Sequence, residues 1–285
     1  MCSFLSLTES NCQVNMKEKL YYNAIMGKSH FIHEHIPERI ENDPYIFLNP
    51  IFDEKKRSQR FYAQTAREFC KMGIPVIRFD YYGTGDSEGQ LFELNLYNIK
   101  IIVSNLIDVF FNKYKIKKMN LLGLRIGADI AMLLGEENSD KINNLILIEP
   151  IVIGKRYLSE QRSRRKIFYK INNMTGIQDE IIIDGEKYED HQGYPISYEN
   201  IQFLDNLDST KTHLNQKDIL LVKLNTISSR KTIGKLKLIL EENNQVNYAN
   251  YTYDDFWANL EPIDTMGLSK EIANELKLNP VSKVL

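Results

Sequence analysis

The segment Leu121–Ala128 constrains the fold more than any other part of this sequence. A short apolar run passes directly into a second apolar segment through Gly123–Gly127, which reads G-L-R-I-G. The two glycines indicate a turn too tight for side chains on its flanks. The residue between them, Arg125, is expected in a strained backbone conformation at the edge of a sheet. A strand that turns straight into a helix is typical of a parallel sheet covered by helices.

The hydrophobic pattern of the remaining chain agrees with such a sheet. Short runs that are apolar throughout alternate with segments whose apolar residues recur every three or four positions. Strands without polar alternation are typical of a parallel sheet buried on both faces. Residues 18–37 alternate around Gly27 and indicate a hairpin at a sheet edge. The expected strands cover residues 45–48, 75–80, 119–122, 145–148, 218–222 and 246–251, and the expected helices 57–72, 93–113, 128–134, 230–240 and 267–278.

The same pattern predicts how the chain is divided. We expect residues 1–15 to be a flexible leader, and residues 16–153 and 214–285 to form one α/β core. Residues 154–213 are polar and charged, and they do not follow the alternation of strands and helices. They are expected to form a cap or lid over the mouth of the site. The basic helix at 155–170 is either an attractor for an anionic ligand or a solvated surface.

The composition of the chain limits the classes of molecule that it is expected to bind. The net charge of −2 leaves no basic field for nucleic acid. No stretch reaches the roughly 18 apolar residues needed to span a bilayer. The three cysteines have no paired or metal-type spacing, which favours a reducing, cytoplasmic location. We expect no cofactor, and as partner a small anionic or acyl molecule, with a homodimer left open.

Two loops accompany the glycine turn in the order that a hydrolase-like chain would show. Residues 80–89 follow the pattern D-x-x-G-x-G-x-S-x-G, in which Asp86 and Ser87 are more consistent with a structural turn than with catalysis. Residues 49–60 follow the first core strand. The backbone N–H of Ile51 or Phe52 is expected to help form an oxyanion hole there.

These segments resemble the α/β-hydrolase superfamily, and within it the second type of exosortase-system-associated hydrolases. In that group the loop after the third strand reads P-F-x-E-E and the elbow reads G-L-R-L-G-A, which residues 50–54 and 123–128 resemble. Residues 150–158, 192–197 and 255–257 are similar to three later motifs of the group. The resemblance implies an α/β-hydrolase fold, with a mostly parallel central sheet, helices on both faces and a cap insertion. It also implies a hydrolase whose substrate is unassigned.

The usual catalytic triad is missing. Arg125 stands where a hydrolase carries serine, and it cannot act as a nucleophile because it stays protonated. No carboxylate follows the strand at 218–222 within residues 225–230, and no histidine follows the strand at 246–251 within residues 252–257. A Ser-His-Asp mechanism needs all three groups. Ordinary serine-hydrolase chemistry is therefore not expected.

The candidate site residues surround Arg125. We predict an ion pair between Glu54 and Arg125, because an unpaired buried arginine is costly. His191 could lie over the pocket from the cap. The candidate catalytic residues are Arg125, Glu54, Asp255 and His191, and the candidate substrate-binding residues are Phe52, Ile126, Leu124, Ser228 and Trp257.

Three functions remain open on the sequence. The first is an enzyme that uses Arg125 and oxyanion-hole donors to bind a carboxylate, phosphate or enolate. It would act in acyl transfer, cyclisation or a hydrolysis-like step. The second is a binding or scaffolding pseudoenzyme with Arg125 in a structural ion pair. The third is an esterase with a displaced serine: Ser58, Ser87, Ser228 or Ser229.

A metal site is one further alternative. His33 and His35 share a strand face and could chelate zinc, with His30 nearby in sequence. An exposed hairpin is the simpler interpretation, and no metal site is predicted.

Overall fold

The computed structural model describes residues 16–174, 179–191, 193–224, 230–259 and 261–278. The leader expected at residues 1–15 lies outside these ranges.

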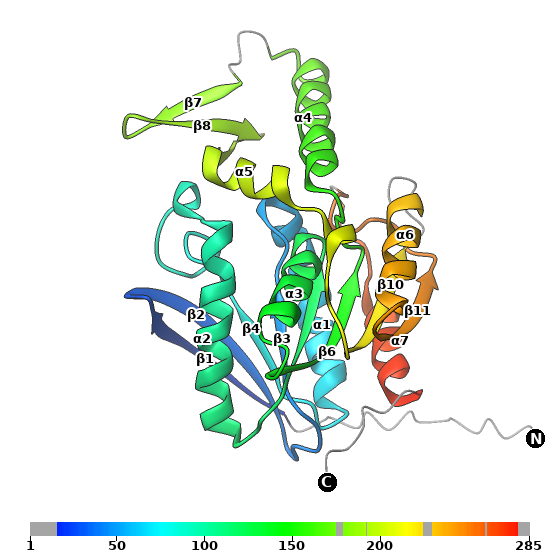
Figure 1. The fold of residues 1–285 in the computed structure, drawn as a ribbon. Coiled ribbons are helices and arrows are strands. Elements are labelled where there is room, and N and C mark those ends of the chain that lie inside the picture. The colour runs from blue at the N-terminus through cyan, green and yellow to red at the C-terminus, as the bar shows by residue number, and fades with distance from the viewer. Residues whose placement is uncertain (1–15, 175–178, 192, 225–229, 260, 279–285) are drawn as a thin grey trace, which may run out of the picture.

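One mostly parallel sheet forms the centre of the described chain (Figure 1). Its strands lie in the order β1-β2-β4-β3-β5-β6-β10-β11, and every pair from β4 to β11 is parallel. The expected hairpin forms the antiparallel edge. The strands are β1 (Met16–Ile25), β2 (Lys28–Pro37), β3 (Tyr45–Leu48), β4 (Val76–Phe79), β5 (Met119–Leu124), β6 (Ile142–Ile148), β10 (Asp218–Leu224) and β11 (Gln245–Tyr251).

Helices cover both faces of the sheet, and successive strand residues alternate between two cores. Tyr45 and Phe47 pack with α1 and α7, whereas Ile46 and Leu48 pack with α2, α3 and α6. This two-sided burial explains why the strands are apolar throughout. The predicted fold class is confirmed. The helices are α1 (Phe52–Cys70), α2 (Leu96–Tyr114), α3 (Ile126–Glu137), α6 (Arg230–Glu241) and α7 (Met266–Leu278), with a 3-10 turn, η1, at Leu91–Glu93.

The elements of residues 154–211 lie beyond the end of the sheet at which β6 points upward in Figure 1. The basic helix expected at 155–170 is α4, while the small antiparallel sheet β7-β8-β9 was missed. Its β7–β8 turn is Asp184-Gly185, with φ of 51° and 85°, a hairpin signal that the sequence carried. The elements are α4 (Gly154–Ile171), β7 (Glu180–Ile183), β8 (Glu186–His191), β9 (Tyr194–Ser197), α5 (Tyr198–Asn206) and the 3-10 turn η2 (Ser209–Lys211).

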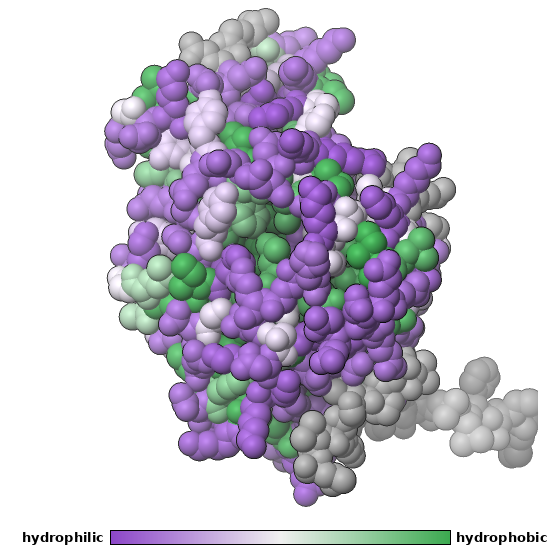
Figure 2. Space-filling model, viewed as in Figure 1, coloured by the Kyte–Doolittle hydropathy of each residue, from purple (hydrophilic) through white to green (hydrophobic). Residues whose placement is uncertain are grey.

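A hollow lined by apolar side chains opens between α2 and α5 (Figure 2). Its volume is about 340 Å³, and its lining includes Tyr97, Met132, Phe203 and the buried Asp129. The carboxylate of Asp129 accepts hydrogen bonds from the backbone N–H groups of Ile151 and Val152 and from the hydroxyl of Ser209. Asp129 therefore ties α3 to both ends of the 154–211 segment. Within the described residues, no helix has the length and apolarity needed to cross a membrane.

Candidate functional site

Arg125 occupies the sharp turn between β5 and α3. Its backbone has φ 56° and ψ −128°, a positive-φ conformation that is strained for a residue with a side chain. The glycines permit the turn, because a Cβ on Gly127 would lie 2.0 Å from the carbonyl oxygen of Leu48. A Cβ on Gly123 would lie 2.2 Å from the carbonyl oxygen of Gly127. The strained turn predicted from the sequence is present.

The side chain of Arg125 is buried and held on several sides. Its Nε lies 3.4 Å from Oε1 of Glu54, so the ion pair predicted from the sequence is present. Its Nη1 donates to the carbonyl oxygen of Glu149 at 3.3 Å. The guanidinium carbon lies 5.3 Å from the ring centre of Trp257 and 5.9 Å from that of Tyr157. Both distances are within the range of a cation–π contact.

Both members of the ion pair keep unused hydrogen-bonding capacity. Among the described residues, Arg125 donates two hydrogen bonds, fewer than a guanidinium can donate. Oε2 of Glu54 is buried and has no partner within the same part of the chain. An orphaned carboxylate oxygen in a buried site is costly unless a ligand or water satisfies it. Within the described residues, the pair is therefore not closed by protein contacts.

Burial and charge set the protonation states of the pair. Burial raises the pKa of Glu54 above its ordinary value, although the charge of Arg125 opposes the shift. Burial is the largest single influence and would lower the pKa of Arg125, but Glu54, Tyr157, Glu149 and Glu160 together outweigh it, so the net pKa is raised. Arg125 therefore stays charged, whereas Glu54 is placed to exchange a proton closer to neutral pH.

Two helix N-termini meet at this pair. Glu54 lies in the first turn of α1, and Arg125 is the residue before the first turn of α3. The first N–H groups of a helix have no partner within the helix, and the helix dipole adds positive potential there. Phe52 opens α1 with φ 53°, a second strained residue beside Arg125. The N–H groups of Phe52 and Ile126 are thus available to stabilise an oxyanion.

A small cavity opens beside the guanidinium. Its volume is about 20 Å³, room for about one water molecule. Binding of anything larger requires side chains that belong to α4 to move. The cavity is lined by Arg125, Pro150, Ile151, Arg156, Tyr157, Glu160 and Thr232.

The predicted substrate-binding residues differ in whether they contact Arg125. Leu124 and Ile126, two of the predicted substrate-binding residues, have side chains that are fully buried in the two cores of the sheet, so only their backbone could contact a ligand. Only the backbone of Ile126 faces the turn. Trp257 contacts Arg125 as expected. Phe52 packs against the ring of Tyr194 at 5.9 Å.

Two further predictions concern the loops at the carboxyl ends of β10 and β11. Ser228 lies outside the described residues. Asp255 is half-buried near Trp257, and its carboxylate makes no hydrogen bond or ion pair within the described chain. Within the described chain, Asp255 makes no contact with Arg125.

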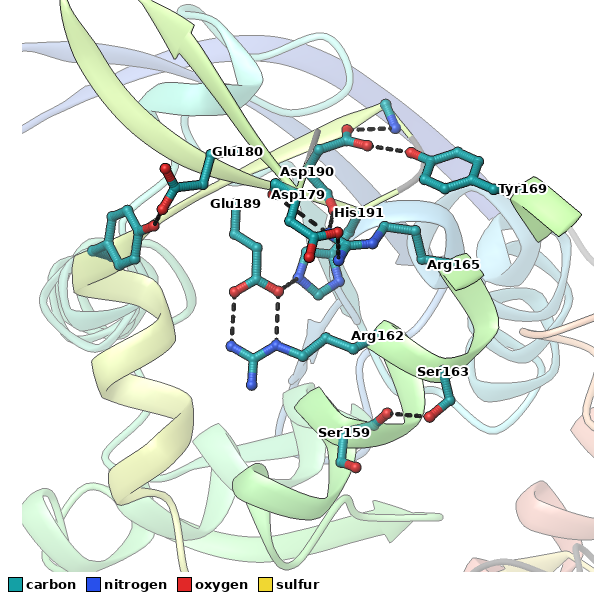
Figure 3. Close-up of polar contacts among 12 residues, drawn as sticks. Ser159, Arg162, Ser163, Arg165, Tyr169, Asp179, Glu180, Glu189, Asp190 and His191 are labelled. Carbon is teal, nitrogen blue, oxygen red and sulfur yellow. Dashed lines mark hydrogen bonds and ion pairs between the residues drawn. The ribbon is translucent and has the colours of Figure 1, made fainter. Parts of the chain in front are cut away.

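His191 belongs to a polar network within residues 154–211 rather than to the Arg125 cavity (Figure 3). Its Nε2 lies 2.8 Å from Oε1 of Glu189, and Arg162 donates to both oxygens of the same carboxylate at 2.8 and 2.7 Å. Burial opposes the charge of Glu189, yet Arg162 and His191 hold its pKa down at about 2. No contact of His191 with Arg125 or Glu54 occurs among the described residues. His191 therefore helps to hold β8 and α4 together through Glu189 and Arg162.

Two residues of the site were missed by sequence reasoning. Glu149 is fully buried directly after β6, and its Oε1 accepts the backbone N–H of Leu224 at 2.6 Å. Its position was a usable signal, because a carboxylate at the carboxyl end of a parallel strand lies at the ligand-binding edge of such sheets. Tyr157 comes from α4, and nothing in its sequence context pointed to Arg125.

Sequence comparisons match parts of the chain to known proteins. Residues 55–180, less than half of the chain, match the model of a family described as serine aminopeptidase, S33. Over 91 residues the chain is 31% identical to a probable alcohol acetyltransferase from Cyberlindnera fabianii. The matched stretch covers 32% of this chain and only 23% of that protein.

Solved structures extend the similarity over nearly the whole chain. Est1E from Butyrivibrio proteoclasticus, in a structure with bound ferulic acid, has a TM-score of 0.66 at 14% identity and covers 92% of this chain and 100% of that one. The chain has the α/β-hydrolase fold. The mouse alpha/beta hydrolase domain-containing protein 10 shares this α/β-hydrolase fold, with a TM-score of 0.57 at 13% identity and coverage of 92% of this chain and 100% of that one.

Proposed function

We propose that this α/β-hydrolase-fold protein is an enzyme without a serine nucleophile, which binds an acyl or carboxylate-bearing small molecule against Arg125. The observation that carries the proposal is the unfilled hydrogen-bonding capacity of the buried Glu54–Arg125 pair. A pair retained for stability alone would be expected to satisfy its polar atoms internally. The unused donors and the orphaned Oε2 instead suit a polar ligand.

The residues around the pair support direct acyl transfer to a hydroxyl group or to water. Glu54 accepts the proton of the attacking hydroxyl as its oxygen forms the new bond to the acyl carbon. The carbonyl oxygen becomes an oxyanion, which Arg125 and the N–H groups of Phe52 and Ile126 stabilise. The bond to the leaving group then breaks, and Glu54 returns its proton to that group. No covalent acyl-enzyme is needed.

The similarity to a probable alcohol acetyltransferase supports an acyl compound as the substrate class. The placement within the exosortase-associated branch stays a prediction, as do the cytoplasmic location and the division into core and cap.

Two serines proposed for a displaced esterase site have structural partners. The hydroxyl of Ser58 donates to the carbonyl oxygen of Lys55 at 3.1 Å. The hydroxyl of Ser87 donates to the carbonyl oxygen of Asp80 at 2.7 Å and accepts the N–H of Phe31 at 2.9 Å. These contacts support the structural role predicted for Ser87. Ser228 and Ser229 lie outside the described residues.

A second candidate is a non-catalytic binding protein with the same ligand site. The missing serine, histidine and acid of a triad favour it, because a fold can be retained without its usual catalytic activity. The two candidates differ in turnover and agree on the binding of an acyl or carboxylate group.

The test is a transfer assay with short-chain acyl thioesters and p-nitrophenyl esters, in water and with added primary alcohols. We expect turnover that falls about a hundredfold or more in Glu54→Gln through kcat, because general acid–base catalysis contributes that much. The matched control is Glu68→Gln, which makes the same change on the same helix away from the site. Binding of the acyl compound without turnover in wild type would favour the non-catalytic candidate, and absence of both would contradict the proposal.

A further inference from the structure

The β1–β2 hairpin brings three metal-ligating side chains together at the far edge of the sheet. Glu18 on β1 is the direct cross-strand partner of His35 on β2, and His33 lies two residues away on the same face. One ligand atom from each residue lies within 4.8 Å of the other two. The two imidazole rings are stacked, with centroids 4.1 Å apart. The hairpin therefore presents two nitrogens and a carboxylate at one place.

His35 departs from the exposed hairpin that the sequence suggested. Its side chain is fully buried, and neither ring nitrogen has a hydrogen-bond partner among the described residues. Buried imidazole nitrogens are ordinarily satisfied, because an unpaired polar group away from water is costly. The expectation of an exposed hairpin is wrong at His35, because β4 pairs with β2 on its inner side and α1 packs against β2. The orphaned ring is the strongest sign of a missing ligand.

The spacing of the ligand atoms fits a single bound metal ion. Nε2 of His33 lies 3.2 Å from Oε2 of Glu18, and Nδ1 of His35 lies 3.5 Å from Oε1 of the same carboxylate. Two ligands at the usual zinc distances in a tetrahedral arrangement are about 3.4 Å apart. Both separations are close to that value, so little rearrangement is needed.

The chemistry of the ligands selects the class of ion. Two imidazoles and one carboxylate suit zinc and other divalent transition metals, whereas magnesium and calcium prefer oxygen ligands alone. Burial lowers the pKa of both histidines, that of His35 to about 3. Both rings are therefore neutral near pH 7, which is the form that binds metal. The partial exposure of Glu18 and His33 leaves a route for the ion.

We propose that Glu18, His33 and His35 bind one divalent transition-metal ion, for which Zn²⁺ is the probe, and that the ion clamps β1 to β2. The site lies apart from Arg125, because β4 and β3 separate β2 from β5. It does not depend on the function proposed above. A metal there fixes the outermost strand of the sheet, which has no partner on its other side in the described sheet.

Two arginines oppose the charge of such an ion. Arg67 lies 3.7 Å from Oε1 of Glu18, and Arg78 is the cross-strand partner of His33 on β4. Both are like charges to a divalent cation and weaken its binding. Arg67 is half exposed, so its replacement by glutamine should be tolerated. Arg67→Gln should therefore tighten binding of the metal ion, whereas replacing a metal-binding residue should weaken it.

The experiment is a titration of the tag-free full chain with Zn²⁺ against a chromophoric chelator. Cys2 and Cys12 are replaced by serine in every protein, so that their thiols cannot bind the ion. We expect one ion per chain. We expect His33→Ala and Glu18→Gln each to weaken binding about tenfold or more, by analogy with the loss caused by perturbing metal-site residues. His213→Ala, an exposed histidine elsewhere, should change nothing.

Arg67→Gln should tighten Zn²⁺ binding, and the Co²⁺-loaded protein should show the absorption of nitrogen and oxygen ligands without a thiolate band. His35→Ala is left out of the primary set because His35 is buried and its loss could unfold the hairpin. No saturable binding of Zn²⁺ overturns the proposal. Binding that is equal in wild type, His33→Ala and Glu18→Gln also overturns it, because the ion would then lie elsewhere.

Discussion

Arg125 and Glu54 form a buried ion pair, with Nε and Oε1 3.4 Å apart, although 71 residues separate them in sequence. The pair brings together the ends of two neighbouring strands, because β3 and β5 are adjacent in the sheet and each is followed by a strained turn into a helix. The arginine therefore does not fill a vacated serine position in isolation. It shares a charge-balanced site with an acid from α1 and with two helix N-termini.

Arg125→Ser should not create a serine hydrolase. A serine at this turn would still lack the histidine and acid of a triad. We expect neither wild type nor the variant to be labelled by a fluorophosphonate probe, with an authentic serine hydrolase as positive control. Labelling of the introduced serine would show that another base activates this position.

Replacing only one residue of the Glu54–Arg125 ion pair should destabilise the protein more than replacing both. Arg125→Met leaves the buried carboxylate of Glu54 without its cation, which costs about 3 kcal/mol of unfolding free energy. The double variant Arg125→Met/Glu54→Leu should regain most of that loss. Urea unfolding of wild type, both single variants and the double variant measures the coupling. Additive losses would mean that the pair contributes nothing to stability.

Asp129 should make stability depend on pH through a buried carboxyl group. Burial raises its pKa to about 6, despite three hydrogen-bond donors that favour the ionised form. The folded state therefore holds a proton that the unfolded chain releases near its ordinary pKa of 3.8. The resulting stabilisation is complete below that value and is lost as pH rises through about 6.

The comparison with Asp129→Asn isolates this effect, because asparagine does not titrate. The excess stability of wild type over the variant should shrink by about 2 kcal/mol between pH 4 and pH 7. Thermal or urea unfolding at several pH values measures the difference. An excess that grows with pH would mean that the three donors lower the pKa of Asp129 instead.

The glycine after the turn should be irreplaceable. Gly127→Ala would place a Cβ 2.0 Å from the backbone oxygen of Leu48, so we expect a loss of about 2 kcal/mol or more. Gly234→Ala in α6 is the matched control, because a Cβ there meets nothing within 4 Å. It should stabilise the protein by about 0.5–1 kcal/mol. Urea unfolding of both variants checks the contrast, and a neutral Gly127→Ala would contradict the close approach.

The sequence alone was sufficient to predict the elements whose structure depends on residues close together in the chain. The apolar strands and the glycine turn were predicted because two-sided burial and tight turns leave direct marks in the sequence. The Glu54–Arg125 contact was predicted because both residues follow core strands of one sheet. The sequence did not indicate that the side chains of Leu124 and Ile126, which flank the turn, point into opposite cores.

Long-range packing decided the parts that sequence reasoning missed. The burial of His35 depends on β4 and α1, which contact β2. The sequence of β2 itself resembles that of an exposed hairpin. Tyr157 reaches Arg125 only because α4 returns over the turn. Neither arrangement leaves a periodic pattern in the local sequence.

The central claim is that Arg125 binds an acyl or carboxylate group, and the chain contains a direct reporter. Trp257 is the only tryptophan of the sequence, and its ring centre lies 5.3 Å from the guanidinium carbon of Arg125. Fluorescence titrations with hexanoate, benzoate and ferulate should give saturable changes in wild type. Arg125→Lys should weaken the binding at least about tenfold, because lysine cannot donate in the bidentate manner of arginine. Saturation that is unchanged in Arg125→Lys and Arg125→Met, or no saturable change with any carboxylate, would contradict the claim.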